Sequence, residues 1–261
     1  MNDDELARLE HENLVAAFTA IVAGITGALV THGGGISVLA SGLPVSLFNR
    51  VLVTDVDAAP GAVAAAVGVM RDRGAPWTVT VRDGVDAGIG MALAELGLVP
   101  DEDPSAPGMA MHPIAVAGSG PAGRASAHDI RDVRGGAGFA DHLAVLVGGF
   151  GMPAELVARV MNPELAKADD VRLYVGYLDG RAVSCGAGIR TGRTIGVYNI
   201  ATVPAARRRG FGAAMTDRVA ADGLAAGCDT AILQASAMGQ PIYERLGYRT
   251  VVRYREWMDP S

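Results

Sequence analysis

The chain has 261 residues, a length that suits one large domain or two smaller ones. Half of the residues are apolar and 19% are charged, which excludes a disordered protein, and the net charge of −6 argues against non-specific nucleic-acid binding. The two cysteines form no CxxC pair, which excludes a zinc ribbon or a disulfide framework and fits the reducing cytoplasm. Residues 1–112 carry a net charge of −9 and residues 113–261 carry +3, so a polyanionic ligand is expected in the second half.

An uncharged, mostly apolar run over residues 14–30 is barely long enough to span a membrane. The residues before it are acidic, whereas a signal peptide begins with basic residues. Threonines and glycines also interrupt the run. We therefore expect a long helix buried in a soluble core, with no membrane partner.

The rest of the first half alternates between strands and helices. Apolar periodicity and turn residues predict strands at 36–40, 51–54, 77–81 and 109–111, and helices at 62–70 and 87–96. The proline-rich acidic stretch 100–107 predicts a surface loop.

The second half predicts a mixed α/β pattern that becomes regular after residue 170. Less regular segments come first, with a strand at 114–117 and helices within 139–147 and 153–161. Asp179-Gly180 predicts a hairpin between strands 171–178 and 182–190. A strand at 194–203, a helix at 211–226, a strand at 230–235, a short helix at 241–246 and a strand at 248–257 follow.

Three arginines and two glycines lie between strand 194–203 and helix 211–226. Gly210 and Gly212 allow close approach of a ligand to the backbone. The free amides of the first helical turn and the helix dipole favour an anion there, and arginine adds forked donors for phosphate oxygens. The segment therefore predicts a pyrophosphate site, with a solvated basic turn as the alternative.

Two motifs of the second half together resemble a known family. Arg207, Gly210 and Gly212 form an RxxGxG segment after Val203-Pro204, and Tyr243-Glu244-Arg245-Leu246-Gly247-Tyr248 follows it at the distance expected. These segments resemble the GNAT superfamily of acyl-CoA-dependent N-acetyltransferases, clearly over residues 170–258 and more weakly over 113–170. The resemblance implies transfer of an acetyl group from acetyl-CoA to a small-molecule or peptide amine, without a metal.

The resemblance also implies roles for individual residues. Tyr243 is expected to act as general acid toward the departing thiolate. The expected cofactor-binding residues are Ala201, Thr202 and Val203, which pair with the pantetheine arm, and Arg207, Arg208, Arg209, Gly210, Phe211, Gly212, Ala213 and Ser236.

The general base is left open by the sequence. Residues 194–203 contain no Asp or Glu, and Tyr198, Asn199 and Thr202 are the polar candidates on that strand. The base could instead come from the other half of the chain, or a weakly basic acceptor could need none.

The first half contains a faint copy of the second. Residues 78–83, 87–96 and 97–98 parallel residues 230–236, 241–246 and 247–248, with Leu93 in the place of Tyr243. The corresponding loop carries Asp55 and Asp57, which would repel a pyrophosphate. We therefore expect an α/β (α+β) fold of tandem GNAT-like mixed sheets flanked by helices, with a degenerate domain at 1–112 and a catalytic domain at 113–261.

Two other interpretations compete with this one. Gly118, Gly120 and Gly123 form a GxGxxG pattern after a strand, but no strand ending in an acidic residue follows, as a dinucleotide site requires. A non-catalytic acyl-CoA-binding module that senses or regulates is the alternative to an enzyme. The sequence leaves open whether the chain forms a homodimer.

Overall fold

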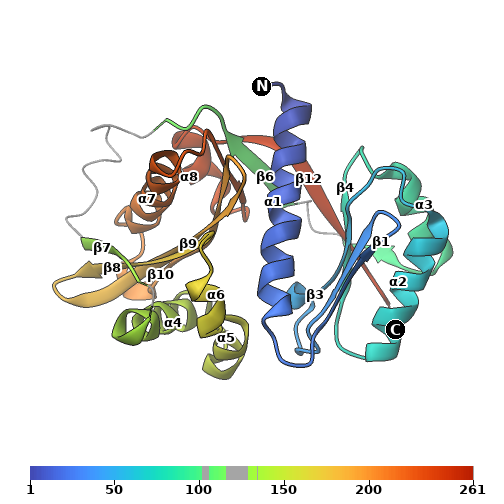
Figure 1. The fold of residues 1–261 in the computed structure, drawn as a ribbon, viewed down its shortest axis with the longest axis horizontal. Coiled ribbons are helices and arrows are strands. Elements are labelled where there is room, and N and C mark those ends of the chain that lie inside the picture. The colour runs from blue at the N-terminus through green and yellow to red at the C-terminus, as the bar shows by residue number, and fades with distance from the viewer. Residues whose placement is uncertain (102–105, 116–128, 134, 261) are drawn as a thin grey trace. The chain divides into compact units, whose positions relative to one another are not determined.

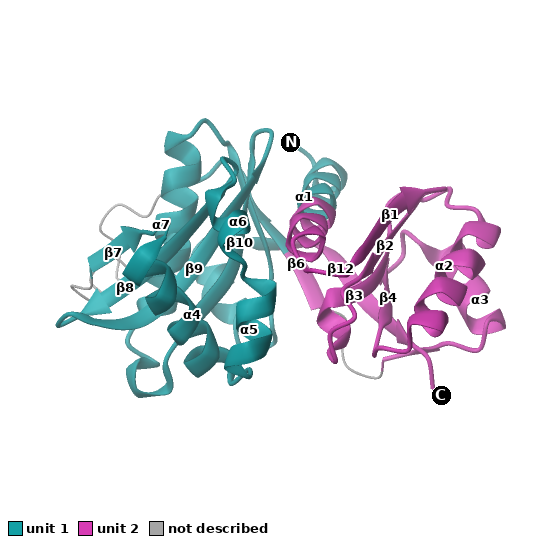
Figure 2. Cartoon of the chain, turned by 60° about the horizontal axis from the view of Figure 1, so that its bottom comes forward, with its two compact units in different colours: residues 1–13, 109–249 teal, residues 14–108, 250–261 magenta. Residues whose placement is uncertain are grey.

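In the computed structural model, the described residues are 1–101, 106–115, 129–133 and 135–260. They form two compact units (Figure 2). Unit 1 comprises Met1–Asn13 and Met109–Arg249, and unit 2 comprises Leu14–Gly108 and Thr250–Ser261. Helix α1 (Asp3–Ala23) therefore gives its first turns to unit 1 and the remainder to unit 2.

Unit 1 is a mixed sheet in the order β6-β11-β10-β9-β8-β7. The strands from β7 to β10 are antiparallel to one another, whereas β10 and β11 run parallel. The strands are β6 (Ala106–Met111), β7 (Asp129–Asp132), β8 (Val171–Leu178), β9 (Arg181–Thr191), β10 (Thr194–Thr202) and β11 (Thr230–Gln234). The helices are α4 (Gly136–Phe150), α5 (Ala154–Val160), α6 (Pro163–Lys167), α7 (Phe211–Ala225) and α8 (Gln240–Arg245).

Helix α7 packs on one face of the unit 1 sheet and α4 on the other (Figure 1). Glycines bring α7 close to the strands. A Cβ on Gly186 of β9 would lie 2.7 Å from Cγ of Met215, and one on Gly223 of α7 would lie 2.6 Å from Cγ2 of Ile195. Real Cβ atoms do not approach that closely, so these positions fix where α7 lies and where its first turn ends up.

Unit 2 repeats this topology in a smaller sheet. Its order is β1-β2-β3-β4-β12, with β5 beside β12, and only β3 and β4 run parallel. Helix α2 connects β3 to β4, as α7 connects β10 to β11. The elements are β1 (Leu29–Gly33), β2 (Ile36–Ala40), η1 (Ser46–Phe48), β3 (Asn49–Val53), α2 (Pro60–Arg73), β4 (Thr78–Arg82), α3 (Ala87–Glu95), β5 (Val99–Pro100) and β12 (Arg249–Met258).

Most predicted elements are confirmed within a few residues, and two differ. The helix expected at 14–30 begins at Asp3 and ends at Ala23, and β1 starts at Leu29. Ile114 and Ala115 are not in a strand, because the preceding Pro113 has no N–H for a ladder and the amide of Ile114 donates to the carbonyl of Asp229. None of the helices in the described part of the chain is long and apolar enough to cross a membrane.

Some segments were not predicted, and some predictions cannot be compared. Strands β1 and β7 are largely exposed and polar, and α6 has only five residues, so none shows strong apolar periodicity. The GxGxxG pattern at 118–123 and much of the loop at 100–107 lie outside the described residues.

His142 of α4 is fully buried against the sheet. Its Nδ1 lies 3.1 Å from the carbonyl oxygen of Tyr174, while Nε2 has no hydrogen-bond partner among the described residues. Burial lowers the pKa of His142 to about 4, from its ordinary value of 6.5. The imidazole is therefore neutral in the folded chain at neutral pH.

The free energy of unfolding is expected to fall as the pH drops from 6.5 to 4. The unfolded chain binds a proton at His142 in that range and the folded chain does not, which corresponds to about 3 kcal/mol by pH 4. Urea unfolding at several pH values should show this loss in the wild type and a smaller one in His142→Leu. Equal pH dependence in both would contradict the buried neutral imidazole.

Candidate functional site

Strands β10 and β11 separate soon after they start. Their parallel pairing covers Thr194 to Gly196 against Thr230 to Ile232, whereas β10 continues against β9 as far as Thr202. Within the described residues, the backbone of β10 beyond Gly196 therefore has no strand partner on its β11 side. Free N–H and C=O groups along an extended strand are suited to pair with an extended ligand.

A bulge interrupts β10 within this stretch. Tyr198 pairs with Ala187, and Ala201 pairs with Cys185. Two residues of β10 but only one residue of β9 lie between these pairs, so β10 contains one extra residue here. Asn199, inside the bulge, adopts a left-handed φ of 55°, and its side-chain amide lies 3.5 Å from Sδ of Met161. Bulges re-aim the backbone at functional sites, and this one lies where the strands part.

The loop after β10 leaves a row of amides without protein acceptors. A short turn, η3 (Pro204–Ala206), ends the strand, and Gly210 caps α7 with a left-handed φ of 84° that favours glycine. No hydrogen bond to the described residues engages five backbone amides, those of Arg208, Arg209, Gly210, Gly212 and Ala213. With the positive end of the α7 dipole, these amides offer the kind of donors that an anion binds.

The three arginines of the loop lie differently. Arg207 is structural: its guanidinium donates to the carbonyl of Thr202 at 3.2 Å and to that of Gly149 at 2.7 Å. Arg209 stacks over the ring of Phe211, 5.1 Å from its centroid. Arg208 has a left-handed φ of 61°, is exposed, and makes no ion pair or hydrogen bond with the part of the chain described. Its guanidinium is therefore available to an anion.

Tyr243 lies on α8, beyond the end of β11. A Cβ on Gly239 would lie 2.9 Å from Cε2 of Tyr243, so only glycine leaves room for the ring. The ring meets Tyr248 edge-on with centroids 6.2 Å apart. Burial raises the pKa of Tyr243, which keeps the phenol protonated. Ser236 serves the turn before α8, because its hydroxyl and carbonyl accept from the amide of Gly239.

Two residues of α1 that the sequence did not single out reach this sheet. Glu10 is fully buried and accepts a hydrogen bond from Nε2 of Gln234 at 2.5 Å. Asn13 is also fully buried and accepts from the hydroxyl of Tyr198 at 2.7 Å. Both lie on the helix face that carries the buried residues Leu6 and Ala17. A polar residue at the helical spacing of buried apolar residues is the sequence signal that could have identified them.

The corresponding loop of unit 2 is closed. The amides of Thr54 and Asp55 both donate to the carbonyl of Gly35, and α2 begins with Pro60, which has no N–H. Ala58 packs so tightly that a Cβ on Gly35 would lie 2.9 Å from its Cβ. β3 and β4 also stay paired up to Leu52, next to the last residue of β3. Among the described residues, the amides of Val56, Ala59 and Gly61 also make no hydrogen bond, but this loop has no arginine and its strands do not separate.

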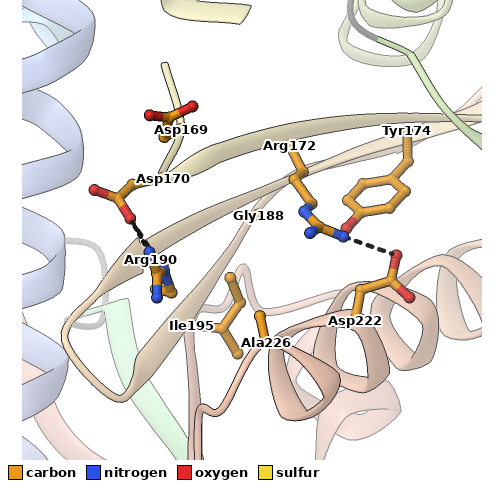
Figure 3. Close-up of a pocket in the computed structure, with 10 residues that line it drawn as sticks. Asp169, Asp170, Arg172, Tyr174, Gly188, Arg190, Ile195, Asp222 and Ala226 are labelled. Carbon is orange, nitrogen blue, oxygen red and sulfur yellow. Dashed lines mark hydrogen bonds and ion pairs between the residues drawn. The ribbon is translucent and has the colours of Figure 1, made fainter. Parts of the chain in front are cut away.

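A pocket of about 150 Å³ lies at the opposite end of α7 (Figure 3). Its charges pair with one another: Arg190 with Asp170 at 2.7 Å, and Arg172 with Asp222 at 4.0 Å. Asp222 is in the last turn of α7, so the pocket adjoins the negative end of the helix dipole. It is therefore separate from the loop between β10 and α7.

Comparisons with known proteins agree with this geometry. Residues 169–250 match the family model of an acetyltransferase (GNAT) domain, and no curated protein matches the sequence. The chain is similar to a GCN5-related N-acetyltransferase from Kribbella flavida, with 18% identity and a TM-score of 0.70 over 98% of this chain and 96% of that one. It is also similar to a tandem GNAT protein from the clavulanic acid biosynthesis pathway, with 14% identity and a TM-score of 0.62 over 98% and 95%. The predicted fold class of tandem mixed sheets is confirmed.

Proposed function

We infer that the protein is an N-acetyltransferase that uses acetyl-CoA and an amine acceptor. The tandem GNAT fold and the GNAT domain match at residues 169–250 support this inference. The row of unengaged amides at the start of α7, beside the separated strand β10, carries this proposal. A diphosphate supplies the acceptor oxygens and negative charge that such amides and Arg208 bind.

The remaining groups fit the rest of the carrier. The β11-facing backbone of Ala201 and Thr202 is proposed to pair with the amides of the pantetheine arm, which then extends from the diphosphate toward the bulge. Val203, which the resemblance also assigns to this role, does not fit it, because its amide donates to the carbonyl of Val183 and its carbonyl accepts from the amide of Ala206. In the reaction, the amine nitrogen bonds to the thioester carbon and the carbon–sulfur bond breaks. Tyr243 is proposed to supply a proton, or a hydrogen bond, to the departing sulfur.

Thiol release tests the proposal. The full chain is incubated with acetyl-CoA and a panel of amines, and free thiol and acetylated amine are both measured. Amine-dependent thiol release with an equal amount of acetylated amine supports an acetyltransferase. Saturable binding of acetyl-CoA without thiol release from any amine would overturn it in favour of a non-catalytic acyl-CoA-binding module.

A further inference from the structure

The residues that bind the carrier leave the proton of the amine without an acceptor. β10 contains no carboxylate, and burial holds the pKa of Tyr198 well above its ordinary value, so this phenol is a poor base. Asn199 carries an amide, which cannot take up a proton. A carboxylate must therefore come from another element if the reaction uses one.

Glu10 of α1 lies across the point where β10 and β11 part. Its partner Gln234 is two residues beyond Ile232, and Tyr198 is two residues beyond Gly196, where the pairing of the two strands ends. Residues two apart on a strand share a face of the sheet, so Gly196, Tyr198, Ile232 and Gln234 face the same side. A Cβ on Gly196 would collide with Oδ1 of Asn13, which identifies this side as the one that meets α1.

The side chains around Glu10 form one connected cluster. Gln234 donates to Glu10 at 2.5 Å and also hydrogen-bonds to Tyr198, whose pKa the nearby charge of Glu10 helps to raise. Tyr198 in turn donates to Asn13, and Asn13 donates to the carbonyl of Ile189 at 3.0 Å. These bonds hold the carboxylate beside the residues that follow the last paired positions of β10 and β11. Burying a carboxylate is costly, so a purely structural role would be served as well by a neutral side chain.

We propose that Glu10 accepts the proton that the amine loses as its nitrogen attacks the thioester. This inference rests on the proposed acetyltransferase function. The nitrogen–carbon bond forms, the carbon–sulfur bond breaks with its electron pair on sulfur, and Tyr243 protonates that sulfur. The amine proton passes to the Glu10 carboxylate, directly or through one water, and afterwards to solvent, from which Tyr243 regains the proton that it gave to sulfur. An acceptor that arrives as a cationic amine first releases one proton to solvent, because its nitrogen needs a free electron pair to attack.

Glu10→Gln in the full chain tests this role, because glutamine keeps the size of the side chain and removes its basicity. We expect the single-turnover rate of acetyl transfer to fall about 100-fold while the Kd for acetyl-CoA changes less than about twofold. In Glu10→Ala, added formate is expected to raise the single-turnover rate about tenfold over the same variant without formate, because a small carboxylate can replace the missing base. Glu12→Gln, on the exposed face of the same helix, is the matched control and should retain the wild-type rate.

Each other outcome counts against the role. Wild-type turnover by Glu10→Gln, or a Glu10→Ala rate that formate does not change, would overturn it. A parallel loss of acetyl-CoA binding in Glu10→Gln would show that Glu10 only supports the sheet. A wild-type chain that binds acetyl-CoA but acetylates no amine would instead overturn the proposed function itself, so the two failures are distinguishable.

Discussion

Tyr243→Phe is expected to lower the single-turnover rate of acetyl transfer about 100- to 1000-fold while leaving acetyl-CoA affinity nearly unchanged. The hydroxyl is the only group removed, and the ring still fills the space over Gly239. Negative charge develops on sulfur as the carbon–sulfur bond breaks, and without the hydroxyl no donor meets it. The rate is measured by rapid-quench detection of acetylated amine, and the affinity by calorimetry.

Tyr248→Phe is the matched control for Tyr243. Its ring touches that of Tyr243, its hydroxyl is buried, and that hydroxyl has no hydrogen-bond partner among the described residues. Removing this hydroxyl therefore costs no hydrogen bond and should leave the rate within about twofold of the wild type. Equal rates in Tyr243→Phe and the wild type would remove the acid role from Tyr243.

Arg208→Glu is expected to raise the Kd for acetyl-CoA about 30- to 100-fold. The wild-type guanidinium is exposed beside the free amides, and the substitution replaces a charge-assisted hydrogen bond to phosphate with repulsion, a loss of about 2 to 3 kcal/mol. The effect should shrink at high salt, because exposed charges are screened. Titration calorimetry at two salt concentrations measures both quantities.

Arg181→Glu controls for the change in net charge. Arg181 starts β9 at the hairpin with β8, is exposed, and lies on a different segment from the α7 loop. We expect its Kd to stay within about twofold of the wild type. A similar loss of affinity in both variants would mean that Arg208 acts through overall charge and has no direct contact with the diphosphate.

Local chemistry accounts for what the sequence could predict. Asp179 and Gly180 adopt φ values of 50° and 75°, the geometry that a tight hairpin requires, and Gly227 with φ 90° follows the end of α7. These residues act within their own segments, so their effects can be read from spacing alone. The arginine–glycine loop was located for the same reason.

Long-range pairing accounts for what the sequence missed. Glu10 and Gln234 are separated by 224 positions, and no local pattern brings a residue of α1 beside β11. The separation of β10 from β11 depends likewise on where pairing between two strands ends. The sequence placed a boundary at residue 112, whereas Met1–Asn13 belongs with unit 1 and Thr250–Ser261 with unit 2. These assignments depend on tertiary packing.

Calorimetric titration of the full chain with acetyl-CoA tests the anion-binding loop most directly. Unit 1 combines free amides at its helix start with an exposed Arg208 and separated strands, whereas the unit 2 loop carries Asp55 and Asp57 and its strands stay paired, so saturation at one molecule per chain is predicted. No heat and no saturation at about millimolar acetyl-CoA, a concentration that would reveal binding as weak as about 4 kcal/mol, would contradict the account.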